Sequence, residues 1–188
     1  MTDFWVFGYG SLMWNPGFPH LETVAARLDG WHRSLCVYSY VHRGTPEQPG
    51  LVLGLDRGGR CRGFAFHVAA WHAAETLAYL REREQVTGVY VEATKRVHLL
   101  DGSGRMAEAL VYLVNRDHQQ YAGKLAPHDV ERLVRQGTGR SGANPHYVLA
   151  TVAHMRESGI RDSRLSALAD RLDDWSKPEA AAVERRQA

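Results

Sequence analysis

The segment Phe4–Pro16, near the start of the chain, constrains the fold more than any other stretch. Its first part, Phe4–Phe7, is aromatic and apolar and predicts a buried β-strand. The pattern changes at Gly8–Ser11, where two glycines flank Tyr9 and predict a tight turn directly after the strand. Glycines let the backbone approach a ligand closely and point its N–H groups outward, which favours a cradle for an anion or a carbonyl group. An ordinary turn within a β protein explains the same local pattern.

Two common glycine-loop motifs are excluded by the residues around this turn. The dinucleotide-binding fingerprint requires a third glycine at the position of Met13. A phosphate-binding P-loop requires Gly-Lys followed by serine or threonine, whereas Gly123-Lys124 is followed by Leu125. The turn therefore does not predict a nucleotide site.

The composition predicts a single globular domain. The chain has 188 residues, of which 44% are hydrophobic and 23% charged, and no Pro- or Ser-rich linker divides it. A net charge of +2 favours neither nucleic acid nor an anionic membrane as partner. The apolar runs are too short for a membrane span, and no signal peptide is expected. Cys36 and Cys61 provide no disulfide framework, so we expect a reduced, cytoplasmic, soluble protein.

The order of predicted elements indicates an α+β fold. Besides Phe4–Phe7, strand patterns cover residues 22–40, 51–55, 61–68, 89–100 and 106–114, and a hairpin is expected at 57–60. Helical patterns cover residues 71–84, 127–136, 144–157 and 163–175, with Asn144 as an expected N-cap. About six strands with helices clustered late predict a small, mostly antiparallel β-barrel or sheet with flanking helices. We expect residues 1–176 to form one domain and residues 177–188 a polar tail.

Glu84 occupies an unusual position in the predicted helix 71–84. At about 100° per residue it lies on the line of four apolar residues, Ala70, Ala73, Leu77 and Leu80. Burial and the negative end of the helix dipole both disfavour a charged carboxylate there. They predict a raised pKa for Glu84, as a general base working near neutral pH requires, whereas Glu82 faces the solvent. Two alternatives are that the helix ends before Glu84, or that Glu84 pairs with an arginine such as Arg81.

Other chemistries receive less support. The ten histidines are scattered without a His-x-x-x-His pair or an acidic residue at ligand spacing, so no metal site is predicted. Ser11 lacks the Gly-x-Ser-x-Gly context of a serine hydrolase. The small-residue loop Arg140–Asn144, before a predicted helix, is equally a candidate carboxylate site or a capping loop.

A set of motifs follows one order along the chain, from Trp5 to about Met155. They are Val6–Leu12 with Trp14 and Pro16, Gly30–Arg33, Ser39 before His42–Glu47, Pro49-Gly50, Leu80–Tyr90 with Arg83-Glu84, Asn115 with Tyr121, and Gly139–Asn144 followed by Tyr147. As an ordered set they resemble the ChaC-type γ-glutamylcyclotransferases, in the glutathione-specific branch. One departure is Val86-Thr87-Gly88, where some members have a shorter Lys-Gly-Gly run.

This resemblance implies a barrel-centred α+β fold, no cofactor, and a lyase that cleaves glutathione to 5-oxoproline and Cys-Gly. It implies that Glu84 is the catalytic general acid/base. It also implies a substrate-binding set, namely Val6, Phe7, Gly8, Tyr9, Gly10, Ser11, Leu12, Arg43 and Tyr147. We further expect a monomer with glutathione as its small-molecule substrate and no nucleic-acid or membrane partner. The alternatives are a cyclotransferase for other γ-glutamyl amines or dipeptides, and a non-catalytic γ-glutamyl-binding protein.

Overall fold

The computed structural model of the protein describes residues 2–173. The chain divides into two compact units. The first consists of Met1–Tyr38 and Val52–Leu125, and the second of Ser39–Leu51 and Ala126–Ala188. The single domain expected over residues 1–176 stays a prediction, and the expected tail, residues 177–188, lies outside the described residues.

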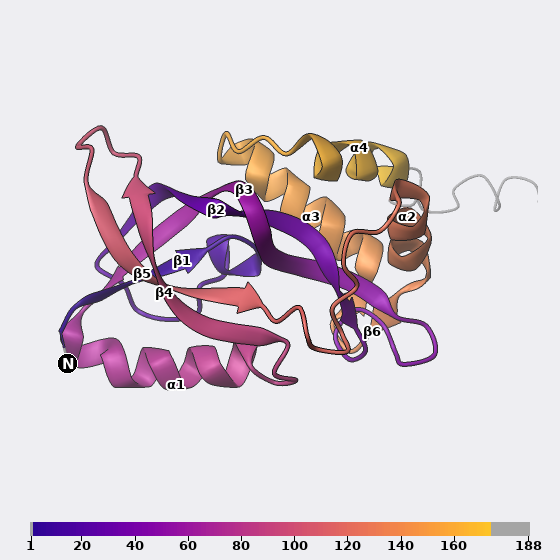
Figure 1. Cartoon of the computed structure of the whole chain (residues 1–188), viewed down its shortest axis with the longest axis horizontal. Helices are drawn as coiled ribbons and strands as arrows, with labels where there is room; N and C mark the ends of the chain where they lie inside the picture. Colours follow the sequence, from indigo (N-terminus) through magenta and orange to yellow (C-terminus); the bar gives the residue numbers. More distant parts are fainter. Residues whose placement is uncertain (1, 174–188) are drawn as a thin grey trace, which may run out of the picture. The chain divides into compact units, whose positions relative to one another are not determined.

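A closed barrel of five strands dominates the first unit (Figure 1). Its strands are β1 (Phe4–Gly8), β2 (Glu22–Ser39), β3 (Gly50–Val68), β4 (Tyr90–Leu99) and β5 (Met106–Val114), in the order β1-β3-β2-β4-β5. β1 is antiparallel to β3, β2 is antiparallel to β4, and β4 is antiparallel to β5. β1 is parallel to β5, and this pair closes the barrel. The predicted α+β class and the mostly antiparallel barrel are confirmed.

The short strand β1 lies between β3 and β5 and carries the glycine turn at its end. Phe4 pairs with Val68 and Gly8 with Phe64 of β3, and both Val6 and Phe7 are fully buried. At Gly8 a Cβ atom would lie 3.0 Å from the ring of Phe66, which is tighter than ordinary contact. Close packing therefore favours glycine where the strand ends and the turn begins.

The structure corrects the predicted hairpin at residues 57–60. Residues Gly50–Val68 form one continuous strand, within which Gly58 and Gly59 have φ values of 97° and 72°. A Gly-Gly pair between apolar runs is also a hairpin signal, which explains the error. The two runs pair with other strands instead, because residues 64–68 are hydrogen-bonded to β1. The glycines let a long strand bend within the barrel.

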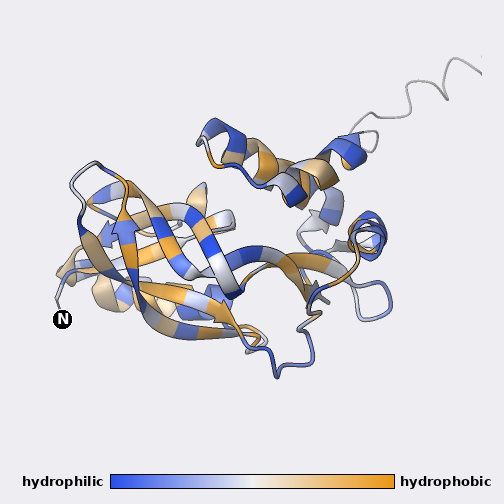
Figure 2. Cartoon of the chain, turned by 45° about the horizontal axis from the view of Figure 1, so that its top comes forward, coloured by the Kyte–Doolittle hydropathy of each residue, from blue (hydrophilic) through white to orange (hydrophobic). Residues whose placement is uncertain are grey.

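Helix α1 (Ala73–Glu84) follows the 3₁₀ turn η2 (Ala70–His72) and lies along one side of the barrel (Figure 1). Its buried residues are Ala73, Thr76 and Leu80. Leu80 packs in a hydrophobic cluster with Val6 and Leu12, on either side of the glycine turn. Figure 2 shows the alternation of hydrophobic and hydrophilic residues along the barrel strands that such a core requires. The core thus fixes the end of α1 beside the turn.

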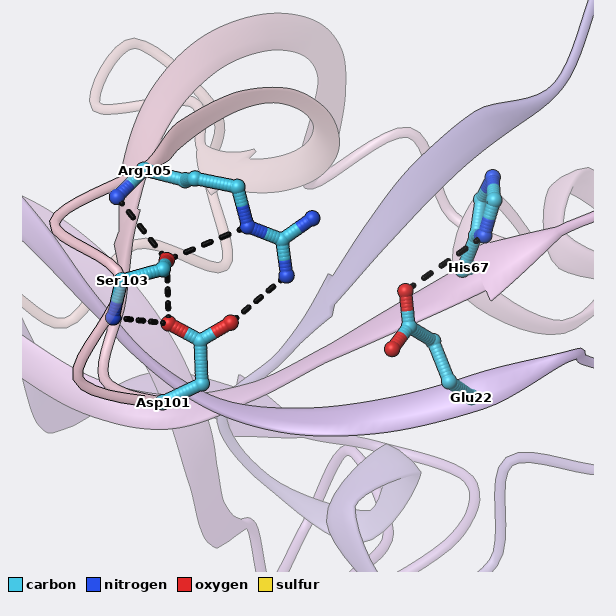
Figure 3. A network of polar contacts seen from close by, with 5 residues as sticks. All are labelled: Glu22, His67, Asp101, Ser103 and Arg105. Atoms are coloured by element: carbon cyan, nitrogen blue, oxygen red, sulfur yellow. Dashed lines mark hydrogen bonds and ion pairs between the residues drawn. The ribbon is translucent and has the colours of Figure 1, made fainter.

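The turn between β4 and β5 is closed by a polar network (Figure 3). The N–H and Oγ of Ser103 donate to Oδ1 of Asp101 at 2.9 and 2.5 Å. Arg105 donates to Oδ2 of Asp101 at 2.6 Å, and Gly102 and Gly104 have φ values of 83° and 71°. These hydrogen bonds hold the pKa of Asp101 far below its usual value. The network thus closes the connection between the two strands predicted over residues 89–100 and 106–114.

The second unit contains the remaining helices. They are α2 (Pro127–Gln136), α3 (Asn144–Glu157) and α4 (Ser163–Leu172), with the two-stranded sheet β6 (Thr138–Gly139) and β7 (Gly142–Ala143) between α2 and α3. The predicted N-cap at Asn144 is wrong, because Ala143 is the N-cap residue. Asn144 is fully buried, and its amide group bonds the N–H and C=O of Leu51 at 2.6 and 2.8 Å. The predicted end of the last helix at Trp175 lies outside the described residues.

Over residues 2–173, none of the helices is both long enough and apolar enough to cross a membrane.

Candidate active site

The glycine turn continues directly into η1, a single 3₁₀ turn at Ser11–Met13. Gly10 precedes it, and no side chain among the described residues caps its start. The first N–H groups of any helical turn have no partner within the turn. This geometry suits an acceptor oxygen from a ligand, as the pattern of Gly8–Ser11 predicted.

Arg33, on β2, supports the turn from the barrel. Its side chain is buried, and its Nε donates to the carbonyl oxygen of Tyr9 at 2.6 Å. One Nη donates to the carbonyl oxygen of Arg62 at 2.7 Å and contacts Sδ of Met13 at 3.7 Å. Among the described residues, no carboxylate forms an ion pair with Arg33, so backbone carbonyls satisfy its hydrogen bonds. Arg33 therefore fixes the backbone of the turn through its hydrogen bond to Tyr9, a contact that its position in the sequence did not indicate.

Glu84 is the last residue of α1, and its side chain is only 17% exposed. Burial raises the pKa of its carboxyl group, and the neighbouring charge of Arg83 partly opposes this shift. Glu82 is exposed. The predicted buried face and the predicted direction of the pKa shift are therefore confirmed, and the alternative that the helix ends before Glu84 is wrong.

The arginines near the end of α1 have separate partners. Nε of Arg83 lies 3.3 Å from Oε1 of Glu84, and a terminal nitrogen of Arg83 donates to Oγ of Ser11 at 2.9 Å. Arg81 instead forms two hydrogen bonds with Glu92 on β4, at 2.9 and 2.8 Å. The alternative that Glu84 pairs with an arginine is therefore confirmed, with Arg83 and not Arg81 as the partner. Arg83 connects the candidate base to the glycine turn.

Tyr112, on β5, is a neighbour of Glu84 that no sequence motif indicated. It is almost fully buried, and its hydroxyl group lies 3.3 Å from Oε2 of Glu92. Burial and the charges of Glu92 and Glu84 raise the pKa of Tyr112 well above its usual value. The only signal in the sequence was a tyrosine within the apolar run Leu110–Val114, which is also typical of a core position.

The structure places the predicted site residues in two groups. In the first unit, the segment Val6–Leu12 and Glu84 lie on neighbouring elements joined by Arg83. In the second unit, the guanidinium carbon of Arg43 lies 5.4 Å from the ring centre of Tyr147. Arg43 also donates to the carbonyl oxygens of Ser141 and Ala143, and burial lowers its pKa. The loop Arg140–Asn144 thus offers carbonyl oxygens to a protein cation.

Within residues 2–173, no group of three or more His, Cys, Asp or Glu side chains is arranged to hold a metal ion.

Similarity to a solved structure identifies the class of fold. The structure of a γ-glutamylcyclotransferase specific to glutathione from yeast superposes with a TM-score of 0.84 at 23% identity, covering 93% of this chain and 97% of that one. The fold is therefore that of the γ-glutamylcyclotransferases. The chain belongs to the ChaC-like protein family, whose model matches residues 4–174.

Relatives with curated names include two glutathione-specific γ-glutamylcyclotransferases. The protein of Escherichia coli (strain K12) is 34% identical over 164 residues, covering 87% of this chain and 70% of the relative. Glutathione-specific γ-glutamylcyclotransferase 1 of Homo sapiens is 29% identical over 170 residues, covering 88% and 77%. The family resemblance inferred from the ordered motifs is confirmed.

Proposed function

We propose that this protein is a glutathione-specific γ-glutamylcyclotransferase that releases 5-oxoproline and Cys-Gly. The observation that carries the proposal is a buried carboxylate, Glu84, joined through Arg83 to a glycine turn, in a chain of the ChaC-like family. The names of the relatives in Escherichia coli and Homo sapiens support glutathione as the substrate.

The reaction is an intramolecular cyclisation in which the nucleophile belongs to the substrate. Glu84 accepts a proton from the γ-glutamyl α-ammonium group, and the free amine then attacks the γ-carbonyl carbon and closes a five-membered ring. The γ-amide C–N bond breaks as the carboxyl group passes this proton to the departing amine of the cysteine. The ring nitrogen gives up its second extra proton by the same route, so Cys-Gly leaves with a protonated amine. Atoms and charge balance without water or a covalent enzyme intermediate. The raised pKa of Glu84 suits this role, since a general base is most effective when its pKa lies near the working pH.

The glycine turn has two tasks in this scheme. Its backbone N–H groups, from Gly8 to Leu12, hold the γ-glutamyl group and stabilise the negative charge that develops on the γ-carbonyl oxygen. It also folds the substrate so that the amine approaches the carbonyl carbon, and such positioning supplies a large part of the rate enhancement in cyclisations. Val6 and Phe7 are fully buried and support the turn from β1.

Arg43 and Tyr147 complete the proposed substrate-binding set. Arg43 is half-buried beside the Tyr147 ring, and its hydrogen bonds go to backbone carbonyls. A guanidinium group that carries its full charge suits a substrate carboxylate. We also propose a cytoplasmic monomer without nucleic-acid or membrane partners. Two buried cysteines that form no disulfide within residues 2–173, and the small net charge of +2, support this.

The test is an assay of 5-oxoproline release from three compounds by the purified protein. Glutathione should be cleaved, and γ-Glu-Ala should be cleaved far more slowly. N-acetylated glutathione should not react at all, because its α-amine cannot attack. Equal turnover of γ-Glu-Ala would favour a broader γ-glutamyl substrate class. Release of Cys-Gly from the N-acetyl compound would reveal hydrolysis and contradict the mechanism, and glutathione binding without any product would favour the non-catalytic binder.

A further inference from the structure

We propose that Arg83 is a positioning residue that fastens the segment Ser11–Pro16 to the end of α1, so that the glycine turn and Glu84 keep a fixed separation. Its catalytic consequence rests on the proposed function. The structural part, a bridge between two elements of the first unit, does not depend on that function.

The guanidinium group of Arg83 contacts four groups besides the carboxylate of Glu84. One terminal nitrogen donates to Oγ of Ser11 at 2.9 Å. The other donates to the carbonyl oxygens of Asn15 and Pro16 at 2.7 and 3.4 Å, and to the hydroxyl group of Tyr79 at 2.8 Å. The segment Ser11–Pro16 lies nearly 70 residues from Arg83 in sequence, at separations of 67 to 72 residues. These contacts are therefore tertiary and hold a loop against a helix.

The shape of the side chain explains why arginine stands at this position. A guanidinium group is planar and presents five donors in a rigid fork, whereas an ammonium group is a point charge on a flexible stem. A guanidinium group can place its Nε beside Glu84 while its two terminal nitrogens bind the segment Ser11–Pro16, and an ammonium group cannot do both. The side chain of Arg83 is 21% exposed, and its bonds to Ser11, Pro16 and Tyr79 are partly shielded from water.

The simpler interpretation makes Arg83 a counter-ion for Glu84 and nothing more. Its charge does oppose the effect of burial on the Glu84 carboxyl group. A lysine would satisfy a counter-ion role but could not replace the fork. The substitution Arg83→Lys therefore separates charge from positioning, and Arg83→Gln removes both.

The first measurement is hydrogen exchange of the backbone amides in the segment. The N–H groups of Met13 and Asn15 donate to the carbonyl oxygens of Gly10 and Ser11, both at 2.9 Å, and their protection reports on this segment. Both Arg83→Lys and Arg83→Gln should accelerate exchange at these amides. Arg81→Gln is the matched control, since this arginine lies on the same helix, forms a similar fork, and binds Glu92 instead. It should leave their exchange unchanged.

The second measurement is the pH dependence of glutathione cleavage. Both Arg83 variants should lower kcat by about 10- to 100-fold, because a displacement of about 1 Å between reacting groups has an effect of that size. Arg83→Lys should keep the acidic limb of the kcat/KM profile near that of the wild type. Arg83→Gln should shift the limb to higher pH, because the charge that lowers the Glu84 pKa is absent. Arg81→Gln should retain kcat.

Each outcome decides the proposal. Unchanged exchange at Met13 and Asn15 in both Arg83 variants, or full kcat in Arg83→Lys, would overturn it. Accelerated exchange together with a wild type that makes no 5-oxoproline would support the bridge and refute the proposed function. If the Arg83 variants do not fold, Tyr79→Phe removes one contact of the guanidinium group and should produce a smaller acceleration at the same amides. No acceleration in that variant would then count against the bridge.

Discussion

A carboxyl group with little access to water prefers its neutral form, and this property separates Glu84 from the other acidic residues on α1. Its side chain is 17% exposed, whereas Glu75 and Glu82 are exposed. The positive charge of Arg83 acts in the opposite direction, yet the pKa of Glu84 remains raised. The single carboxylate at the buried end of the helix is therefore the group suited to proton transfer.

The substitution Glu84→Gln should abolish nearly all turnover and leave the fold intact. A well-placed general base contributes about 10²- to 10⁴-fold to the rate, and this one also reprotonates the leaving amine. The amide is nearly isosteric, so the circular dichroism spectrum should not change. Glu82→Gln is the control, on the exposed face of the same helix, and should remain active. Near-normal activity in Glu84→Gln with an inactive Glu82→Gln would show that the base lies half a turn earlier.

The pH dependence of stability follows from the raised pKa of Glu84. A carboxyl group with a higher pKa in the folded state stabilises the fold fully below the unfolded-state value, near 4.5. That contribution is lost as the pH rises through the folded-state pKa. Glu84→Gln should therefore become more stable than the wild type as the pH rises from 4.5 toward neutrality. Urea unfolding at several pH values measures this difference, and a difference independent of pH would contradict the burial effect.

Residues differed in how far the sequence revealed their roles. The helical period placed Glu84 on the buried face because neighbours on one helix are related by a fixed rotation. Arg33 escaped notice because its acceptors, the carbonyl oxygens of Tyr9 and Arg62, lie 24 and 29 residues away and are backbone groups. No side-chain pattern encodes such a contact.

At the level of elements, the loop between β1 and β2 meets α1 at Gly17. This glycine has a φ of 75°, and a Cβ atom there would overlap the hydroxyl group of Tyr79. The same hydroxyl group accepts a hydrogen bond from Arg83 at 2.8 Å. A side chain at Gly17 would therefore both strain the backbone and displace a contact that reaches the end of α1.

Gly17→Ala should lower both stability and turnover. A left-handed backbone conformation costs an ordinary residue about 1–2 kcal/mol, and the clash with Tyr79 adds to that cost. Gly102→Ala is the matched control, since its φ is 83° and no atom lies within 4 Å of the added Cβ. Urea unfolding and 5-oxoproline assays should show a similar backbone cost in both variants and lost turnover only in Gly17→Ala. Equal turnover in the two variants would contradict the link from this loop to α1.

The bounds of an element were predicted well where residues at its own ends mark them. They were not predicted well where pairing with a distant strand decides them. Pro127 and Gly137 flank α2, whose predicted bounds agree with the structure. The glycines at 58 and 59 carried a turn signal, but strand pairing elsewhere kept them inside β3. Asn144 carried a capping signal, but two buried backbone groups of Leu51 bind its amide.

For the whole molecule, the class of fold was accessible because the strands precede most of the helices in the chain. The strand pattern left a closed barrel and an open sheet as alternatives, because closure depends on the parallel pair of β1 and β5, in which Trp5 pairs with Ala109 and Val6 with Leu110. These residues are separated by more than half of the chain, and local periodicity carries no information on such a pairing. Likewise, Ser39–Leu51 belongs to the same compact unit as the C-terminal helices. No change in the composition of the chain indicates where this segment begins or ends.

The His, Cys, Asp and Glu side chains of the described residues form no cluster suited to a metal ion. A protein zinc site uses three or four His, Cys or carboxylate ligands. His67 has the richest acidic surroundings among the described histidines, with Asp3 at 3.4 Å and Glu22 at 3.7 Å (Figure 3 shows Glu22), and its ring stacks on Trp5. These three side chains are not arranged to hold a metal ion, nor is any other group of three or more such side chains within residues 2–173.

Release of 5-oxoproline from glutathione should continue unchanged in the presence of a metal chelator. The physical reason is that the proposed steps need only a carboxylate, backbone N–H groups and the amine of the substrate. Activity is compared before and after treatment with excess EDTA, with Glu84→Gln as the inactive reference in both conditions. Added zinc should not raise the rate. Loss of activity in EDTA that zinc restores would show that a metal ion takes part, and the proton transfer assigned to Glu84 would have to be reassigned.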